Sequence, residues 1–476
     1  MSLQEWKTDE RLMLPVTVHT LGCRLNQAES EAVVDAFKSK GFKIISPGEK
    51  FFGMGIIIVN SCTVTSQADQ KTRRVLRKAL RENPGAFVIA AGCYAAMDLE
   101  ESLSSEEDAY NMRRLFILKR NAAAGNAGAV KSSLLKLPDY LLACGIVSGS
   151  INAASLRQTL NNWAAEIGEN SPFAFNPKEF SLHSRSYLKI QEGCNSKCSY
   201  CRVRIARGES VSLSPQIALE RLQSLENSGF SEAMVTGVNI TQYRWQEFNL
   251  AGLLDYLLKG SSAIALRLAS LEPEGITENL VSVFKNPRIR PHFHLSLQSG
   301  CGTVLQRMRR AYDAQRAGHC ITQLRSAKEN PFLACDIIAG FPGETEEEFC
   351  QTLTFCEKNN FAWIHAFPFS KRKGTEAYSM KGSVCERETA FRVKRLTEIA
   401  MQGRKNYAQY WLGRKLWAVV EKEKLGQCRA VSENYLKLLL NNASHSLSPG
   451  SLIRCIPIAL CNGANGETAD AIAEIV

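Results

Sequence analysis

Residues 190–208 read IQEGCNSKCSYCRVRIARG, and the three cysteines in this stretch set the interpretation of the whole chain. Cys194, Cys198 and Cys201 have a C-x3-C-x2-C spacing and form what we call the loop triplet. Three thiolates so close together can hold one iron–sulfur cube and leave its fourth iron without a protein ligand. A zinc site would need a fourth Cys or His nearby, and this loop has none. The spacing favours a cluster, although a zinc knuckle or three unrelated thiols are also compatible with it.

The triplet follows the first of six short apolar runs that alternate with helical stretches between residues 183 and 405. The runs are strand candidates and read SYLKIQ, EAMVTG, IALRLAS, HFHLSL, LACDIIAG and FAWIHAFPF. Between them, Ser214 and Pro215 mark a helix start, and Thr345 with Glu348 forms a capping box. Six such units predict a partial (β/α)6 barrel of parallel strands. The triplet would then lie at the carboxyl end of the strands, where such folds carry out their chemistry.

A second set of cysteines is spread through residues 1–125. Cys23, Cys62 and Cys93, which we call the strand-end trio, each follow a short apolar run: VTVHT, GIIIVN and AFVIA. Helix-like stretches separate these runs, so a Rossmann-like α/β domain with parallel strands is predicted. Parallel strands end at the same edge of a sheet, where open α/β folds bind ligands. This placement favours a second cluster over three buried core cysteines, which are common in proteins.

The rest of the chain is divided by composition. Residues 126–182 are rich in Ala, Asn and Ser and are interpreted as a connecting segment. Residues 410–476 carry short β-like runs, KLWAVVEKE, YLKLLLNN, SLIRCIPIAL and DAIAEIV, which predict a small all-β barrel. Barrels of this kind are common RNA-binding appendages, although a structural cap is equally compatible. The predicted fold class is therefore α/β: a Rossmann-like domain, a partial barrel over residues 183–405, and a small all-β barrel.

Charge and hydropathy limit the class of protein. Lys and Arg number 58 against 47 Asp and Glu, and this net charge of +11 suits a polyanionic partner or a solvated basic face. The N-terminal residues contain no apolar signal segment, and the longest apolar stretch, 86–97, is too short to span a bilayer. We therefore expect a cytoplasmic protein that does not contact membranes and whose 16 cysteines form no disulfides. No GxxxxGK[ST] or HExxH motif supports triphosphate hydrolysis or zinc proteolysis.

Eight ordered motifs resemble the radical S-adenosylmethionine methylthiotransferases over nearly the whole chain. TLGCRLNQAESE, VNSCTVTSQADQKTRR and AGCYA are similar to the family's N-terminal segments. TGVNI, LASLEP, HFHLSLQSG, CDIIAGFPGET and FPFSKRKGTEA are similar to its barrel motifs. The tail, with Glu421 and SENY at 432–435, resembles the TRAM RNA-binding domain. The opening motif and HLSLQSG are most similar to the branch that acts on N6-threonylcarbamoyladenosine at position 37, next to the tRNA anticodon.

The resemblance implies two 4Fe–4S clusters and S-adenosylmethionine as cofactors. The loop triplet would hold the cluster that chelates S-adenosylmethionine, whose reductive cleavage gives a 5′-deoxyadenosyl radical. That radical would remove the C2 hydrogen of the adenine, and the auxiliary cluster on the strand-end trio would deliver a methylated sulfur. The implied partners are tRNA, an electron donor of the flavodoxin or ferredoxin type, and a source of sulfur.

Further contacts follow from the resemblance alone. Tyr200 of the triplet loop would contact S-adenosylmethionine, as would five residues at strand ends: Gly237, Ser270, Glu272, Gln298 and Gly340. Three residues would contact the RNA: Arg372, Asn434 and Tyr435. The glycines are also explained by tight turns between strand and helix. Arg372 is also explained by a solvated basic loop.

The chain departs from the family's pattern after the triplet. Arg202 and Arg204 stand where an apolar residue and a proline are usual, and Ala430 and Ser432 stand where Gly and Thr are usual. These changes affect expectations about substrate geometry more than about chemistry. The rival activities are methylthiolation of another modified adenosine or of a ribosomal-protein aspartate. A non-catalytic iron–sulfur RNA-binding protein or a zinc-binding RNA chaperone would also fit parts of the pattern.

Overall fold

The computed structural model describes residues 14–49, 53–97, 113–119, 127–146, 152–168, 170–182, 184–424, 426–441, 447–461 and 469–476. Two units result from the packing of the chain. The first consists of Met1–Ser181 with Arg202–Gly208, and the second of Leu182–Cys201 with Glu209–Val476. The domain boundary predicted at residues 125–126 lies outside the described residues. No described helix is both long enough and apolar enough to cross a membrane.

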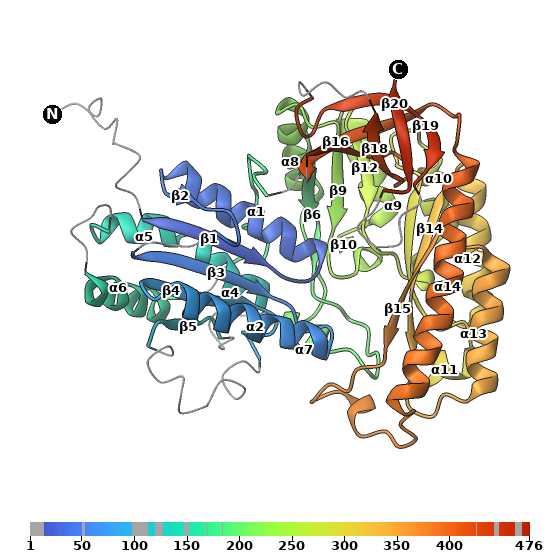
Figure 1. The fold of residues 1–476 in the computed structure, drawn as a ribbon, viewed down its shortest axis with the longest axis horizontal. Helices are drawn as coiled ribbons and strands as arrows, with labels where there is room; N and C mark the ends of the chain where they lie inside the picture. The colour runs from blue at the N-terminus through green and yellow to red at the C-terminus, as the bar shows by residue number, and fades with distance from the viewer. Residues whose placement is uncertain are drawn as a thin grey trace. The chain divides into compact units, whose positions relative to one another are not determined.

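The first unit is built on a five-stranded parallel sheet, drawn in blue in Figure 1. Its strands are β1 (Pro15–Thr20), β2 (Lys43–Ile44), β3 (Gly55–Ser61), β4 (Ala86–Gly92) and β5 (Leu115–Ile117). The spatial order is β2-β1-β3-β4-β5. Strands β3 and β4 are buried along their whole length, as expected for central parallel strands covered on both faces. This is a doubly wound order whose topological switch point, the usual ligand site, lies between β1 and β3.

Helices cover this sheet. They are α1 (Arg24–Ser39), α2 (Ser66–Glu82), α4 (Ala127–Ser132), α5 (Leu137–Ala143), α6 (Ala153–Ala165) and α7 (Val203–Arg207), with a 3-10 turn at Ser133–Leu135. Helix α2 packs Leu76 and Leu80 against the sheet residues Ile57, Val59 and Val88. Helices α4 to α6 belong to the stretch that composition alone marks as connecting, and the described part of it is mostly helical. Helix α7 joins this unit although it directly follows the loop triplet in sequence.

The second unit contains all six predicted barrel strands. They are β6 (Ser186–Lys189), β9 (Glu232–Thr236), β12 (Ala265–Leu268), β13 (His292–Gln298), β14 (Phe332–Ala339) and β15 (Trp363–Pro368). They form two parallel sheets, β12-β9-β6 and β13-β14-β15, which isolated bridges at Leu266–Ile289 and Leu271–Leu295 link. In the described chain β6 and β15 do not pair with each other, so the barrel is partial as predicted.

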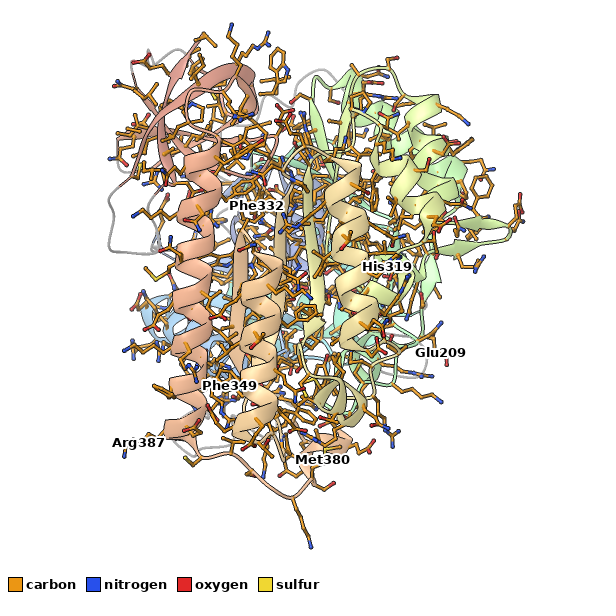
Figure 2. All side chains as sticks on the ribbon, turned by 90° about the vertical axis from the view of Figure 1, so that its right-hand side faces the viewer. Glu209, His319, Phe332, Phe349, Met380 and Arg387 are labelled. Atoms are coloured by element: carbon orange, nitrogen blue, oxygen red, sulfur yellow. The ribbon has the colours of Figure 1, made fainter. Side chains whose placement is uncertain are left out.

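Helices cover the outside of these strands. They are α8 (Pro215–Asn227), α9 (Leu250–Gly260), α10 (Glu278–Phe284), α11 (Gly302–Arg307), α12 (Ala314–Ala327), α13 (Glu346–Asn359) and α14 (Glu386–Tyr410). Both predicted helix starts are confirmed: Ser214 caps α8, and Thr345 and Glu348 form the capping box of α13. Figure 2 shows α12, α13 and α14 side by side, with His319 on α12 and Phe349 on α13. Shorter elements lie between them: β7 (Gln191–Glu192), β8 (Val211–Ser212), β10 (Arg244–Trp245), β11 (Phe248–Asn249) and 3-10 turns at Ile240–Gln242, Pro273–Gly275 and Glu376–Tyr378.

The tail forms a closed five-stranded barrel, β16-β17-β18-β20-β19. The strands are β16 (Leu416–Lys424), β17 (Gln427–Ser432), β18 (Lys437–Asn441), β19 (Leu452–Leu460) and β20 (Ala471–Ile475). Four of them coincide with predicted runs, and β17 is an addition. The apolar core of this barrel is continuous with Phe332 of β14 and with Tyr407 and Trp411 of α14. The small barrel is therefore packed onto the end of the larger one within the second unit.

A buried ion-pair network joins the two barrels. Glu232 of β9 accepts hydrogen bonds from Arg267 at 2.6 and 2.9 Å and from Arg290 at 2.9 Å. Arg267 also donates to the carbonyl of Ser432 in β17, and Arg290 pairs with Glu433. The Glu232 carboxylate is enclosed, so its charge depends on these guanidinium partners.

Candidate functional site

The loop triplet lies in the second unit, on the segment that follows the short strand β7. The three thiols are partly buried. The amide of Ser196 donates to the sulfur of Cys194 at 3.4 Å, and the amide of Cys201 donates to the carbonyl of Cys198 at 3.1 Å. The segment between Cys194 and Cys201 is therefore a tightly turned loop with local hydrogen bonds.

Hydrogen bonds from three other elements fix this loop. Ser199 donates its amide to the carbonyl of Met308 at 3.1 Å, and its own carbonyl accepts from the amide of Ala377 at 2.7 Å. The side chain of Gln242 accepts from the amide of Asn195 at 2.8 Å and donates to the hydroxyl of Ser196 at 2.9 Å. The loop is therefore positioned before anything binds to it.

Arg310 is the main charged neighbour of the triplet. Its Nη1 donates to the sulfur of Cys198 at 3.1 Å and lies 3.4 Å from the hydroxyl of Tyr200. Its Nη2 donates to the carboxylate of Glu272 and to the carbonyl of Ser296. Only 4% of the Arg310 side chain is exposed. Arg310 therefore places a buried guanidinium against the sulfur of Cys198, the kind of surrounding contact that orients a metal ligand.

The residues predicted to contact S-adenosylmethionine gather at the carboxyl ends of the barrel strands or on the loop itself. Gly237 follows β9, Ser270 and Glu272 follow β12, Gln298 ends β13 and Gly340 follows β14. Tyr200 lies on the loop, where burial raises its pKa well above the usual value. This arrangement brings the predicted set to one edge of the barrel, although which of them contact the cofactor stays a prediction.

Two of these positions have an unusual backbone conformation or a fixed side-chain partner. Gln298 has a left-handed φ of +66°, which residues other than glycine rarely adopt. It lies at an irregularity in the pairing of β13 with β14. Backbone strain of this kind concentrates at functional sites. Ser270 shares a hydrogen bond of 2.8 Å with Nδ1 of His294, whose Nε2 lies 3.2 Å from Asp336. The hydroxyl of Ser270 is therefore already held by a neighbour on β13.

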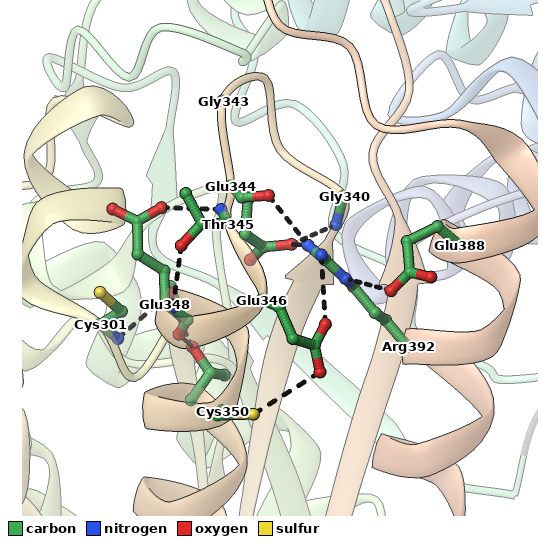
Figure 3. Close-up of polar contacts among 12 residues, drawn as sticks. Cys301, Gly340, Gly343, Glu344, Thr345, Glu346, Glu348, Cys350, Glu388 and Arg392 are labelled. Atoms are coloured by element: carbon green, nitrogen blue, oxygen red, sulfur yellow. Dashed lines mark hydrogen bonds and ion pairs between the residues drawn. The ribbon is translucent and has the colours of Figure 1, made fainter.

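The two glycines also have structural reasons. A Cβ at Gly237 would lie 2.8 Å from Oε1 of Gln191, which also accepts the amide of Asn239. Gly340 has a φ of +75°, and a Cβ there would lie 2.3 Å from Oγ1 of Thr389. Figure 3 shows the amide of Gly340 donating to Glu344, whose carboxylate also accepts from Arg392. The turn after β14 is therefore tied to α14 through a buried ion pair.

The strand-end trio lies in the first unit, at the carboxyl edge of its sheet. Cys23 directly precedes α1, Cys62 follows β3 and Cys93 follows β4. Burial raises the pKa of the Cys62 thiol, and the neighbouring charges of Cys23 and Cys93 raise it further, to about 12. The parallel topology puts the three cysteines at one edge of the sheet, and their joint role as ligands stays a prediction.

Glycine is required beside this trio. Gly22 has a φ of +103°, and a Cβ there would lie 2.7 Å from the sulfur of Cys62. Gly92 has a φ of +97°, and a Cβ there would lie 2.3 Å from the carbonyl oxygen of Ser61. A side chain at Gly22 would therefore overlap Cys62 itself, and a side chain at Gly92 would overlap the backbone of Ser61, the residue before it.

Polar residues of α1, α4 and α7 lie buried behind the trio. Arg207 of α7 donates from Nε to the sulfur of Cys93 at 3.2 Å. Its other nitrogens donate to Glu29 at 3.2 Å and to Asn26 at 2.8 Å. Lys131 of α4 pairs with the same Glu29, and burial followed by the charge of Arg207 lowers its pKa. An enclosed group of two cations and one carboxylate therefore borders the strand-end trio.

The sequence alone does not mark Arg207 and Arg310 as site residues. Arg310 occurs in RMRRAY, a stretch that is compatible with phosphate contact and with an ordinary charged face. Arg207 ends the segment that begins with the triplet, but its partners Asn26 and Glu29 come from TLGCRLNQAESE, far away in the sequence. The only signal in the sequence is the polar run in α1, a helix that buries Asn26, Glu29 and Glu31.

The predicted RNA contacts lie inside the second unit. Asn434 is fully buried and accepts a hydrogen bond from the hydroxyl of Ser432. Tyr435 has a φ of +69° and packs its ring 4.1 Å from that of His292. Arg372 is 5% exposed, and its carbonyl accepts from Thr375. Their assignment to RNA stays a prediction, and their visible role is to join the two barrels or to fix a turn.

The departures near the triplet lie at the start of α7. Arg202 occupies the N-cap position of α7 without a capping hydrogen bond from its side chain, and it is buried; Arg204 lies in the first turn of that helix. Proline is tolerated in the first helical turn, so the helix forms either with the family's usual proline or with Arg204. In the tail, Ala430 lies in β17 and Ser432 ends it, within the closed barrel.

All sixteen cysteines carry free thiols. Over the residues that the structure describes, no three or more His, Cys, Asp or Glu side chains are arranged to hold a single metal ion. A four-iron cube spaces its thiolates more widely than one ion spaces its ligands, so this observation does not bear on either set of cysteines. The donors available to a cluster in each set are three thiols bordered by one buried arginine.

Sequence profiles match two regions of the chain. Residues 15–112 match the uncharacterized protein family UPF0004, and residues 188–356 match the radical SAM superfamily. The first region contains the strand-end trio and the second contains the loop triplet. Each set of cysteines therefore lies within a separately matched region.

Curated relatives cover most of the chain. The threonylcarbamoyladenosine tRNA methylthiotransferase MtaB of Treponema pallidum is 36% identical over 475 residues, which cover 93% of this chain and 98% of that protein. MtaB of Bacillus subtilis is 31% identical and covers 90% of each chain. The tRNA-2-methylthio-N(6)-dimethylallyladenosine synthase of Methylacidiphilum infernorum is 29% identical and covers 86% of this chain and 85% of that protein. Among solved structures, the radical S-adenosylmethionine methyltransferase TsrM of Kitasatospora setae has a TM-score of 0.46 at 13% identity and covers 75% of each chain.

Proposed function

Because the chain belongs to the radical S-adenosylmethionine methylthiotransferases, in the branch of the threonylcarbamoyladenosine tRNA methylthiotransferases, we propose that it methylthiolates C2 of N6-threonylcarbamoyladenosine next to the tRNA anticodon. The proposal includes two 4Fe–4S clusters, one on each set of three cysteines. The observation that carries it is the pair of cysteine sets, each at the carboxyl edge of its own parallel sheet and each beside a buried arginine.

The residues present suit these groups. In the second unit, Cys194, Cys198 and Cys201 would hold the cluster that binds S-adenosylmethionine, and in the first unit Cys23, Cys62 and Cys93 would hold the auxiliary cluster. Three thiols leave one iron of a cube open to another ligand. When bound, the clusters and S-adenosylmethionine supply the radical and sulfur-transfer chemistry.

The protein's own residues orient these groups and set their charge. Arg310 donates to the sulfur of Cys198 and is itself held by Glu272. Gln298 and Ser270 lie at neighbouring strand ends, and we propose that they border the site of S-adenosylmethionine, with the hydroxyl of Ser270 fixed by His294. The carboxyl ends of the strands are where a parallel barrel admits its substrate.

The substrate partner is tRNA, and the reaction also needs an electron donor and a source of sulfur. Two observations support tRNA as the substrate: relatives are named for tRNA modification, and the chain has a net charge of +11. An electron donor of the flavodoxin or ferredoxin type fits a cluster that must be reduced before each cleavage. The relative that acts on dimethylallyladenosine defines the main competing substrate.

The nucleoside profile of bulk tRNA tests the substrate. The protein is expressed in a host that lacks its own enzyme for this modification, and digested tRNA is analysed by mass spectrometry. We expect the 2-methylthio derivative of N6-threonylcarbamoyladenosine, and none with Cys194→Ala. Methylthiolation of isopentenyladenosine instead, or of a ribosomal-protein aspartate with an unchanged nucleoside profile, would replace the proposed substrate.

Iron analysis tests the number of clusters. After anaerobic reconstitution we expect about eight irons per chain, four for each cube. Four or fewer irons together with firmly bound zinc would contradict the two-cluster proposal while leaving the tRNA substrate to the nucleoside test.

A further inference from the structure

Arg207 makes a contact with Cys93 that packing alone does not require. All three nitrogens of its guanidinium donate hydrogen bonds, and Nη2 donates to Glu29 at 3.4 Å as well as to Asn26. Nε donates to the sulfur of Cys93 at 3.2 Å, Nη1 to Glu29 at 3.2 Å, and Nη2 to Asn26 at 2.8 Å. The arginine is 2% exposed. A planar guanidinium fixed on two sides by other partners has little freedom to turn its third donor away from the sulfur.

The partners of Arg207 are themselves fixed and buried. Glu29 and Asn26 are each 1% exposed on α1, and Lys131 is 2% exposed on α4. Lys131 pairs with Glu29 and donates to Asn26 at 3.1 Å and to Asn60 at 3.4 Å. Two cations thus share the carboxylate of Glu29, and the guanidinium is the one that also contacts a sulfur of the trio.

We propose that Arg207, held by Glu29, Asn26 and Lys131, is a positioning residue that stabilises the auxiliary cluster and sets its reduction potential through the hydrogen bond to Cys93. This inference rests on the proposed function, because it takes the strand-end trio to be a cluster site. Hydrogen bonds to the sulfurs and nearby charge are two of the main determinants of the potential of an iron–sulfur cluster. A fixed cation stabilises the more negative reduced form, so the loss of Arg207 makes the cluster harder to reduce.

A comparison within the same unit separates this role from simple packing. Arg114 is another buried arginine, 8% exposed, but it donates to the backbone carbonyls of Leu80, Asn83 and Ala86. Ala86 begins β4, whereas Cys93 follows the end of that strand. Arg114 therefore fixes the opposite edge of the sheet, and it offers a matched control for the removal of a buried guanidinium.

The second unit repeats the arrangement on unrelated elements. Arg310 donates to the sulfur of Cys198 at 3.1 Å while Glu272 holds it. In both units one buried arginine contacts one cysteine of the set and is paired with one carboxylate. A contact produced only by the packing of a particular helix would have no reason to occur at both sites.

The test isolates the auxiliary cluster in the full-length chain. Replacing Cys194, Cys198 and Cys201 together by alanine removes the other cluster site, so bound iron and the electron paramagnetic resonance signal come from the strand-end trio alone. In this background we expect about four irons per chain. If this triple variant binds no iron at all, the proposals of an auxiliary cluster and of a role for Arg207 are both wrong. The Arg207 variants are compared only when the triple variant binds iron.

Three variants are then compared by iron content and by redox titration of the signal. With Arg207→Gln we expect the midpoint to move to a more negative potential, so that the reduced-to-oxidised ratio at a fixed potential falls at least tenfold, or about 59 mV for one electron. Iron affinity should fall by roughly 10–100-fold, as is usual for residues that support a metal ligand. Arg207→Lys keeps the charge and should recover part of both losses. Arg114→Gln should keep the background potential.

Two results would overturn the inference. One is an Arg207→Gln protein that binds four irons with the background potential and spectrum. The other is an equal loss of iron in Arg207→Gln, Arg207→Lys and Arg114→Gln, because that pattern means that any buried arginine of this unit is needed merely for folding. Neither result would alter the nucleoside profile expected of the unchanged protein, so the proposed function is judged separately.

Discussion

At the scale of single residues, the strand-end trio depends on two neighbouring glycines as much as on its thiols. Gly22 and Gly92 both have left-handed backbone angles, and both face atoms of Ser61 or Cys62 at distances that leave no space for a Cβ. Proteins place glycine at such points because any other residue adds both steric overlap and backbone strain. The position of Cys62 is therefore limited by the close approach of residues that are distant in the sequence.

Gly22→Ala should selectively remove the cluster proposed on the strand-end trio. An L-residue at this φ costs about 1–2 kcal/mol, and the new methyl group would overlap the sulfur of Cys62. We expect iron after reconstitution to fall from about eight to about four per chain. Gly145→Ala is the matched control, because Gly145 has a φ of +73° but has open space around its Cβ position. Equal iron content in the two variants would contradict the prediction.

The two sets of cysteines should separate two steps of the reaction. Cys194→Ala should abolish both the formation of 5′-deoxyadenosine and the insertion of sulfur, since it removes a ligand of the loop triplet. Cys62→Ala should still form 5′-deoxyadenosine but should no longer insert sulfur. Both products are measured by liquid chromatography with mass spectrometry, and the exposed Cys144→Ala serves as the control. Normal sulfur insertion by Cys62→Ala would mean that the strand-end trio is only structural.

At the scale of elements, β9 and β12 contribute charges that hold the tail barrel. Burial alone would raise the pKa of Glu232, but the charges of Arg267 and Arg290 outweigh it and lower the pKa to about 2. Arg267 reaches from β12 to the carbonyl of Ser432 at the end of β17. Strands of both barrels are thus linked through a single enclosed carboxylate.

Glu232→Gln should weaken this junction in a pH-dependent manner. Breaking a buried pair costs about 3–5 kcal/mol, which urea denaturation followed by tryptophan fluorescence would measure near neutral pH. The folded-state pKa of Glu232 lies below the unfolded value of about 4.3, so its stabilisation is complete above that value and is lost as the pH falls toward 2. The difference in unfolding free energy between the unchanged protein and Glu232→Gln should therefore shrink as the pH falls from about 4.3 toward 2.

An exposed pair provides the control for that experiment. Glu329 contacts Arg414, which precedes β16, at 3.0 Å, but both side chains are largely in solvent. Glu329→Gln should change stability by at most about 1 kcal/mol. A similar loss in both variants would show that the burial of Glu232 is not what makes its ion pairs important.

The elements that could be predicted are those whose sequence carries their own signal. The six barrel strands are apolar runs bounded by helix starts, and the Thr345–Glu348 capping box is local, so both are readable. Strand β17 reads QCRAVS, which is short and has only one strongly apolar residue, Val431, so its pairing with neighbours in the closed barrel defines it. Arg207 could not be assigned because its partners, on α1 and α4, are brought to it by the fold.

At the scale of the whole molecule, the positive charge is the property most directly tied to an RNA substrate. Lys and Arg exceed Asp and Glu by 58 to 47, yet the residues predicted to touch RNA, Asn434 and Tyr435, lie within the second unit. The sequence therefore supplies general positive charge rather than an identified set of base contacts. Such charge contributes to affinity through the release of counterions from phosphates.

Binding of tRNA should accordingly depend strongly on salt. We expect the association constant, measured by filter binding with unmodified tRNA, to fall at least about tenfold between about 50 and 200 mM monovalent salt. Binding of S-adenosylmethionine, which has no phosphate, should change much less over this range. A tRNA affinity that does not vary with salt would mean that few phosphates are contacted.

The crossing of α7 into the first unit also governs the order in which the protein can mature on the ribosome. Domains commonly fold as synthesis proceeds, N-terminal first. Here the residues up to Ser181 are not sufficient, because Glu29 and Asn26 gain a principal partner only when Arg207 has emerged. By then all six proposed ligands have also been translated. A nascent chain that stalls before Gly208 would expose the unfinished trio to oxidation, and a fragment cut at Ser181 would make a poor substitute for the natural unit in expression studies.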